Sequence, residues 1–322
     1  MSSAVFIGTV QISLRALERV IALDFPLNAI CTLPIEKGYR HSDYVDLAPI
    51  AESNGIQCFH TEFINSSEAV HEIQSYQPDF IFCIGWSQIL SRNVLEIPKK
   101  GCVGFHPSPL PQNRGRAVIP WTILQGRSET AGSLFWLDEG VDSGEIIMQH
   151  PIELDYGETA STLYDKQVLG LENMLNEVLP LLKDGRLPRA VQNHGTATYC
   201  SKRTRSDGFI NWELPALDIW NLIRATSKPY PGAFSLYEGS EIIIWEADLI
   251  KSPIHTGLPG QIQAMENGHA IVSCGGGTNL IVKKVQVLGK NEAIPSEVLK
   301  VQSRMGLSRY EVASKIIEQN NK

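Results

Sequence analysis

His106 and Asp142 are the two side chains whose type and position are best suited to proton transfer. His106 follows the apolar run Cys102–Phe105 and precedes a proline-rich turn. A histidine at the carboxyl end of a buried strand can stabilise an oxyanion or relay a proton near neutral pH. Asp142 lies in a loop with glycines on both sides and could orient or deprotonate His106. The alternatives are a histidine that only caps the turn and an aspartate that only bonds to its own backbone.

Two arginines lie just beyond the proline-rich turn. Arg114 and Arg116 flank Gly115. Two guanidinium groups beside a candidate catalytic histidine are suited to a phosphate or carboxylate of a substrate. A solvated surface pair explains the same pattern equally well. The substrate-binding prediction comprises Ser108, Arg114, Gly115 and Arg116.

Other kinds of site have no support in the sequence. The remaining histidines do not form HxH or i, i+4 pairs with acids, so we expect no metal site. There is no GxSxG motif and no cysteine in a nucleophilic context, so covalent catalysis is not expected. The 6 cysteines are scattered without a CxxC pair, which favours free thiols in a reducing compartment.

The composition is that of a globular protein. The 322 residues are 43% hydrophobic and 20% charged, which is enough for a sizeable core and suits two domains. A formal net charge of −7 does not favour a dedicated nucleic-acid binder, although a local basic channel can lie on an acidic protein. The first residues lack a signal peptide pattern, and no apolar run approaches a membrane span. We expect a soluble, cytoplasmic protein.

The first half of the chain alternates short apolar runs with helical patterns. Strands that are apolar throughout and alternate with helices imply a parallel sheet covered on both faces. The Gly8-Thr9 turn lacks the GxGxxG pattern and predicts a tight strand-to-helix turn. The expected strands are Ala4–Gly8, Ala29–Leu33, Ile56–Phe59, Phe80–Gly85 and Cys102–Phe105, and the expected helices are Ile12–Leu23, Tyr44–Asn54 and Ser67–Gln77.

The second half of the chain has a different pattern of expected elements. A strand over Glu145–Leu154 and a long helix over Thr159–Lys183 are expected to complete the first domain. From Ala233, about five short strands separated by turns predict a small open barrel. A polar amphipathic helix is expected over Pro295–Gln319. The expected parts are a catalytic domain over residues 1–200, a linker region over 201–232 and a barrel domain with a terminal helix over 233–322.

Several long motifs resemble one enzyme family. HPSPLPQNRGRA, PWTIL and LDEGVDSGEII resemble the 10-formyltetrahydrofolate-dependent formyltransferases, both the sugar N-formyltransferases and the methionyl-tRNA formyltransferases. SDGFINW, LIRATSKPYPGAF and PGQIQAM extend the resemblance over nearly the whole chain. The resemblance implies a Rossmann-like formyltransferase domain followed by an open, OB-like β-barrel. It also implies transfer of a formyl group from 10-formyltetrahydrofolate to a primary amine.

The resemblance assigns roles to several residues and exposes one departure. His106 matches the family histidine and Asp142 the family aspartate, whereas Gly104 stands where the family has an oxyanion-binding asparagine. Loss of such a donor typically costs on the order of 100- to 1000-fold. His106 with a backbone N–H, another side chain such as that of Asn113, or an impaired enzyme would account for this glycine. By similarity, the folate contacts Trp86, Ser87, Gln88, Ile89, Leu90, Leu137, Asp138, Glu139, Gly140 and Val141.

The acceptor amine decides between several functions. We expect a nucleotide-linked amino sugar, because Arg114 and Arg116 suit a diphosphate and Glu36–Asp46 lacks a basic cluster. Initiator methionyl-tRNA is the alternative, and nucleic acid is a partner only in that case. A third interpretation is a non-catalytic folate- or sugar-nucleotide-binding protein, motivated by Gly104. The sequence does not settle the oligomeric state, and a homodimer is suggested only by analogy with sugar-acting members of the family.

Overall fold

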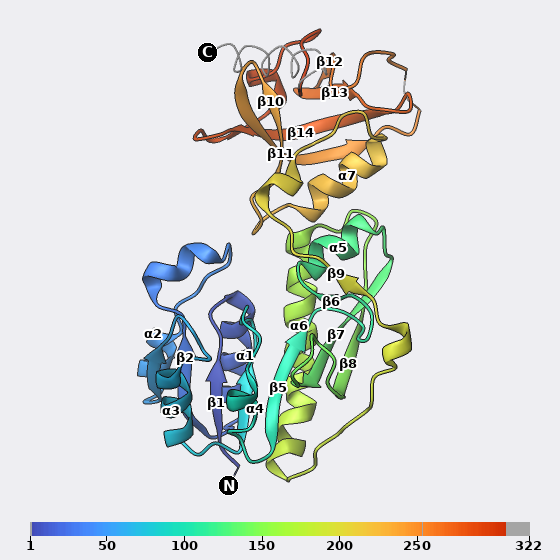
Figure 1. Cartoon of the computed structure of the whole chain (residues 1–322). Coiled ribbons are helices and arrows are strands. Elements are labelled where there is room, and N and C mark those ends of the chain that lie inside the picture. The colour runs from blue at the N-terminus through green and yellow to red at the C-terminus, as the bar shows by residue number, and fades with distance from the viewer. Residues whose placement is uncertain (1, 253, 307–322) are drawn as a thin grey trace, which may run out of the picture. The chain divides into compact units, whose positions relative to one another are not determined.

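The computed structural model describes residues 2–252 and 254–306 (Figure 1). The chain divides into two compact units. The first comprises the described residues up to Ile119 together with Arg127–Tyr156 and Thr162–Lys202. The second comprises Pro120–Gly126, Gly157–Ser161 and the described residues from Arg203 onward. The domain limits expected at residues 200 and 232 stay a prediction.

A seven-stranded sheet forms the centre of the first unit, in the order β3-β2-β1-β4-β5-β7-β8. The first five strands in this order are parallel, whereas β7 pairs antiparallel with both β5 and β8. The expected α/β fold is thus confirmed, and β7 is an additional strand. The strands are β1 (Ala4–Ile7), β2 (Leu27–Thr32), β3 (Gln57–His60), β4 (Phe80–Cys83), β5 (Gly101–His106), β7 (Glu129–Trp136) and β8 (Ile146–Glu153).

Helices cover this sheet because its central strands are apolar on both faces. All four residues of β1 are fully buried, and the rings of Phe25 and Phe82 pack edge to face at 5.2 Å. Of the helices that the structure describes, none has the length and apolar character that crossing a membrane requires. The α-helices before β9 (Tyr199–Cys200) are α1 (Gln11–Ala22), α2 (Ala48–Ser53), α3 (Ser67–Ser75), α4 (Arg92–Leu95), α5 (Val118–Leu124) and α6 (Ala160–Lys183), and 3-10 turns occur at Ile35–Arg40 and His194–Thr196. The residues of α5 from Pro120 onward belong to the second unit.

A short second sheet lies beside the main one. β6 (Arg114–Gly115) pairs in parallel with β9 (Tyr199–Cys200). This pairing attaches the chain that follows His106 to the segment after α6. Two segments far apart in the sequence therefore meet next to the end of β5.

The second unit is built on an antiparallel sheet, in the order β10-β11-β14-β13-β12 with β15 on β14. Trp212 and Trp220 anchor its core, and their indole N–H groups donate to Ser235 Oγ at 2.9 Å and to the Ala247 carbonyl at 2.8 Å. An α/β domain followed by an antiparallel C-terminal domain is thus confirmed. Its elements are α7 (Ala216–Ala225), β10 (Ala233–Tyr237), β11 (Ser240–Leu249), β12 (Ile262–Glu266), β13 (His269–Ser273), β14 (Asn279–Val287) and β15 (Glu292–Ala293), with 3-10 turns at Arg205–Gly208 and Pro295–Glu297.

The helix expected over Pro295–Gln319 does not form in the residues that the structure describes. Beyond the 3-10 turn that ends at Glu297, the chain up to Gly306 runs in turns. The backbone N–H groups of Gln302 and Met305 donate to the carbonyls of Ile262 and Gly260, so the chain continues the sheet edge. The prediction is wrong for residues 295–306, and residues 307–319 lie outside the described part of the chain.

Candidate active site

A pocket of about 450 Å³ opens at the carboxyl ends of β4 and β5 in the first unit. His106 is the last residue of β5 and lines this pocket together with Asp142. This position, next to β1 where the strand order reverses, is the usual place for ligands in open α/β sheets. Of the other predicted site residues, the pocket is lined by Trp86, Ser87, Gln88, Ile89, Leu90, Gly115, Arg116, Leu137, Asp138, Gly140 and Val141.

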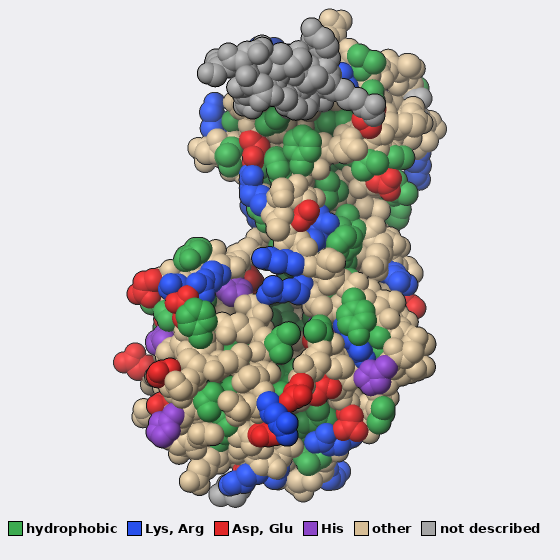
Figure 2. Space-filling model, viewed as in Figure 1, with side chains coloured by type: hydrophobic (Ala, Val, Ile, Leu, Met, Phe, Trp, Pro, Cys, Tyr) green, Lys and Arg blue, Asp and Glu red, His purple; other side chains and the backbone are tan. Residues whose placement is uncertain are grey.

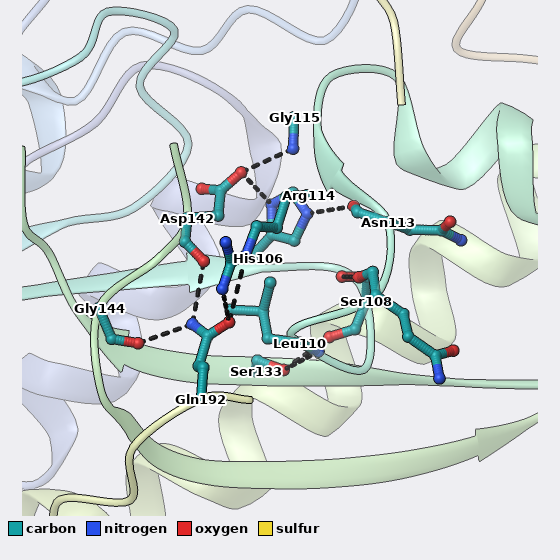
Figure 3. A network of polar contacts seen from close by, with 11 residues as sticks. His106, Ser108, Leu110, Asn113, Arg114, Gly115, Ser133, Asp142, Gly144 and Gln192 are labelled. Atoms are coloured by element: carbon teal, nitrogen blue, oxygen red, sulfur yellow. Dashed lines mark hydrogen bonds and ion pairs between the residues drawn. The ribbon is translucent and has the colours of Figure 1, made fainter. Parts of the chain in front are cut away.

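The imidazole of His106 is buried and held in a defined orientation (Figure 3). Its side chain is only 7% exposed, and Nε2 lies 2.8 Å from the backbone carbonyl oxygen of Asn113. Because a carbonyl oxygen can only accept, Nε2 carries the proton and donates it. The other ring nitrogen, Nδ1, lies 3.6 Å from Oδ2 of Asp142. Nδ1 is therefore the nitrogen that can exchange a proton with a ligand or with Asp142.

Asp142 is held in an unusual backbone conformation. Its φ is +48°, in the left-handed region, and its Oδ2 accepts a hydrogen bond of 2.8 Å from the Gly115 N–H. A side chain at Gly115 would not fit, since a Cβ there would lie 2.5 Å from the Cys200 carbonyl oxygen. The pairing of β6 with β9 thus requires glycine at position 115, and this glycine presents the N–H that fixes the Asp142 carboxylate.

Residues that the sequence did not identify complete this arrangement. The Thr198 hydroxyl accepts from the backbone N–H of Asn113 at 2.8 Å. Gln192 donates to the backbone carbonyls of Asp142 and Gly144. These contacts come from a segment with no periodic pattern, so only the three-dimensional fold brings it to the site.

Three predicted binding residues do not line the pocket, and their binding roles stay predictions. Arg114 is 2% exposed, and its guanidinium bonds to the side chains of Gln192, Tyr199 and His194. Ser108 is fully buried and donates to the Gln112 carbonyl. Glu139 is exposed and lies 3.8 Å from Arg92. Burial or outward orientation thus separates these side chains from a ligand in the pocket, whereas Arg116 lines it.

Gly104 leaves no empty space where an asparagine side chain would be. A Cβ built at Gly104 would lie 2.5 Å from Cδ2 of Leu137 and 3.3 Å from Cε1 of Phe135. Leu137 therefore fills this part of the site. The suggested substitute, Asn113, presents its backbone carbonyl to His106, and its side-chain amide points away (Figure 3). Asn113 thus orients the histidine and is not a replacement oxyanion donor.

Substituting Gly104 with asparagine is expected to destabilise the protein. Because Leu137 occupies the space, Gly104→Asn should lower the free energy of unfolding by about 1–3 kcal/mol. Urea denaturation measures this change, and Gly157→Asn is the matched control because a Cβ at Gly157 meets nothing within 4 Å. Adding Leu137→Ala should relieve the clash, so the double variant should lose less stability than the two single changes combined. Strict additivity would contradict this packing argument.

The residues that line the pocket are compatible with a bound folate ring system. The buried indole N–H of Trp86 has no hydrogen-bond partner among the described residues, so a ligand acceptor would satisfy it. Burial raises the pKa of the pocket-lining Cys83 thiol to about 12, so it stays neutral and is a poor nucleophile. Among residues 2–252 and 254–306, no group of three or more His, Cys, Asp or Glu side chains is placed to hold a metal ion.

Comparison with known proteins identifies both parts of the chain. Residues 42–179 match the formyl transferase family, and residues 202–303 match the formyl transferase C-terminal domain. A methionyl-tRNA formyltransferase of Acetivibrio thermocellus is 32% identical over 88% of this chain and 91% of its own length. Another from Alkaliphilus oremlandii is 29% identical over 98% of both chains. The similarity thus extends through both units.

Solved structures have the same fold. The sugar 3N-formyl transferase WlaRD, solved with dTDP and 5-N-formyl-THF, has a TM-score of 0.65 at 20% identity and covers 90% of this chain and 99% of its own. HypX from Aquifex aeolicus, solved with tetrahydrofolic acid, has a TM-score of 0.65 at 16% identity and covers 92% of this chain and 46% of its own. At these identities the likeness establishes the fold alone.

The relatives overturn the expected acceptor. Several full-length relatives at about 30% identity are named methionyl-tRNA formyltransferases, which contradicts the prediction of a nucleotide-linked amino sugar. The interpretation as a non-catalytic binding protein is also wrong, whereas the expected enzyme class and its 10-formyltetrahydrofolate co-substrate are confirmed. The chain therefore belongs to the formyl transferase family and is a folate-dependent N-formyltransferase.

Proposed function

We propose that this enzyme transfers the formyl group of 10-formyltetrahydrofolate to the amino group of methionyl-tRNA. The observation that carries the proposal is the similarity to methionyl-tRNA formyltransferases through both units, including one that covers 100% of this chain at 30% identity. The pair formed by His106, at the end of β5, and Asp142 supports it, because formyl transfer needs a group that moves a proton between two nitrogens.

His106 and Asp142 carry the chemistry in this proposal. The neutral amine attacks the formyl carbon, and Nδ1 of His106 accepts the proton that the attacking nitrogen loses. The same proton passes to the folate nitrogen as its bond to the formyl carbon breaks. The imidazolium that exists between these steps has Nδ1–H toward the Asp142 carboxylate and Nε2–H on the Asn113 carbonyl. The anionic Asp142 stabilises that cation and keeps the ring in one orientation.

The pocket has two sides in this proposal. The loop Trp86–Leu90 and the segment Leu137–Val141 line one side, where the folate would pack. Arg116 lies at the opening, and its guanidinium donates to the Ser87 carbonyl at 3.2 Å while remaining exposed. We assign Arg116 to the acceptor, where its charge would attract a phosphate of the tRNA end.

The overall acidity of the chain is compatible with a tRNA acceptor. Lys37 and Arg40 both pair with Glu62 next to the exposed side chains of Ile35 and Tyr39. Figure 2 shows basic, acidic and hydrophobic side chains interleaved over the face that it displays. Basic groups are thus present near residues 35–40 although the net charge is −7. A net charge describes the whole molecule, whereas a phosphate contact depends on local groups.

An acceptor panel tests the proposed function. The purified full-length chain is incubated with 10-formyltetrahydrofolate and either initiator methionyl-tRNA, uncharged tRNA or a set of nucleotide-linked amino sugars. Formylmethionyl-tRNA is the expected product, with no reaction on uncharged tRNA because it lacks the amine. Turnover of any sugar without turnover of methionyl-tRNA would refute the proposal.

A further inference from the structure

Gln192 bonds to two backbone carbonyls of the loop that carries Asp142, although it does not line the pocket (Figure 3). Its side-chain nitrogen Nε2 donates to the Asp142 carbonyl at 2.9 Å and to the Gly144 carbonyl at 2.6 Å. Gln192 is 3% exposed, so water does not replace these bonds. One amide group thus fixes the turn in which Asp142 adopts its left-handed conformation.

Arg114 determines which way this amide faces. Oε1 of Gln192 accepts from Nη2 of Arg114 at 2.6 Å and from Nε at 3.2 Å. A guanidinium can only donate and a carbonyl can only accept, so the amide is satisfied in one orientation alone. Arg114 is held in turn by the Tyr199 hydroxyl and by Nδ1 of His194, both at 3.1 Å.

The same segment also supports the other half of the catalytic pair. Arg114 directly precedes Gly115, whose N–H binds the Asp142 carboxylate, and follows Asn113, whose carbonyl binds His106. Asp142 is therefore held at its backbone carbonyl by Gln192 and at its carboxylate by the Gly115 N–H. Displacement at either end would change its 3.6 Å separation from His106 Nδ1.

We propose that Gln192 is a positioning residue, which Arg114 orients so that its amide holds the Asp142 carboxylate against His106. This inference rests on the proposed role of the His106–Asp142 pair. It also gives Arg114 a function different from the phosphate contact expected from the sequence. A misplacement of about 1 Å at a reacting group can cost on the order of 100-fold in rate, so such a support affects catalysis without touching the substrate.

Gln192→Glu separates positioning from structural support. The carboxylate keeps its acceptors for Arg114 and strengthens that pair, so the buried guanidinium stays compensated. Its second oxygen faces the carbonyls of Asp142 and Gly144, where no donor remains and lone pairs repel. We expect kcat for methionyl-tRNA formylation to fall about 10- to 100-fold with KM for the folate nearly unchanged. Gln286→Glu is the matched control, because Gln286 also accepts from a side chain and donates to a backbone carbonyl, in the second unit.

The decisive comparison uses Asp142→Asn as a second background. If Gln192 acts through the Asp142 carboxylate, Gln192→Glu should change kcat by less than about threefold once that charge is absent. An equal loss of kcat in both backgrounds would overturn the proposal. So would full activity of Gln192→Glu in a folded protein.

Amide hydrogen exchange provides a readout that needs no substrate. The Gly115 N–H should exchange faster in Gln192→Glu than in the wild type or in Gln286→Glu, because its bond to Asp142 is loosened. Unchanged exchange would contradict the positioning role. If the wild-type chain formylated no methionyl-tRNA, the proposed function would fail, and the exchange rates would still decide whether Gln192 holds Asp142.

Discussion

Replacing His106 with alanine is expected to lower kcat for formyl transfer by about 100- to 10,000-fold. In the described part of the chain, the hydrogen bond to Asp142 Oδ2 comes from the Gly115 backbone N–H, which cannot relay a proton in place of the imidazole. Folate binding should change little, since the loop Trp86–Leu90 is unaltered. Rapid-mixing measurements of formylmethionyl-tRNA formation, together with a folate-binding titration, check both parts of this expectation.

Two further variants control the His106 experiment. His71→Ala removes an exposed imidazole from α3 and should retain full activity. His106→Gln keeps an N–H donor for the Asn113 carbonyl but cannot relay a proton, so it should be inactive even if the alanine variant is unstable. Substantial activity of a folded His106→Gln protein would contradict the assigned role.

Asp142→Asn is expected to cause the second large effect, a loss in kcat of about 100- to 10,000-fold. The amide oxygen can still accept from the Gly115 N–H, so the loop geometry should persist while the negative charge disappears. Without that charge, the imidazolium form of His106 loses its counterion 3.6 Å away. Steady-state kinetics should show the loss in kcat with KM for both substrates largely retained.

The control for Asp142 is an aspartate of the same unit on the surface. Asp184 is exposed and, among residues 2–252 and 254–306, forms an ion pair with Arg186, so Asp184→Asn should behave as the wild type. A crystal structure of Asp142→Asn should retain the left-handed turn at residue 142. Near-normal kcat in that unchanged structure would show that the carboxylate charge is not used.

Much of the architecture could be predicted because burial leaves a strong pattern in the sequence. β1 and β4 are apolar at nearly every position, and this pattern is typical of strands that are covered on both faces. His106 was recognisable because an apolar run ends at it before a proline-rich turn. The long helix expected over Thr159–Lys183 begins at Ala160 and ends at Lys183, as its apolar spacing predicts.

Other features depend on contacts that no local pattern encodes. The strand β7 contains Gly132, which lies beside the ring of Phe105. A Cβ at this position would lie 2.8 Å from a ring carbon, so tertiary packing rather than strand propensity determines that this segment forms a strand. Arg114 and Arg116 look equivalent in sequence, yet one is buried on Gln192 and the other lines the pocket. Strand pairing with β9 separates them, and that pairing joins residues far apart in the chain.

The incorrect choice of acceptor has the same physical origin. The choice of a sugar nucleotide rested on Arg114 and Arg116 as a diphosphate site and on the absence of a basic cluster over Glu36–Asp46. Arg114 is not available to a diphosphate because its guanidinium is buried among protein partners. Lys37 and Arg40 do provide basic groups in that stretch, and both lie against Glu62. Neither sequence argument therefore distinguished a sugar nucleotide from a tRNA.

The most direct test of the central claim is a single-turnover measurement of formyl transfer to initiator methionyl-tRNA. Excess enzyme, labelled 10-formyltetrahydrofolate and methionyl-tRNA are mixed, and formylmethionyl-tRNA is quantified over time for the wild type and Asp142→Asn. The account predicts rapid product formation by the wild type, and a transfer step slowed by at least about 100-fold in a variant that still binds both substrates. Transfer at equal rates, or no formylmethionyl-tRNA from a folate-bound wild-type enzyme, would contradict it.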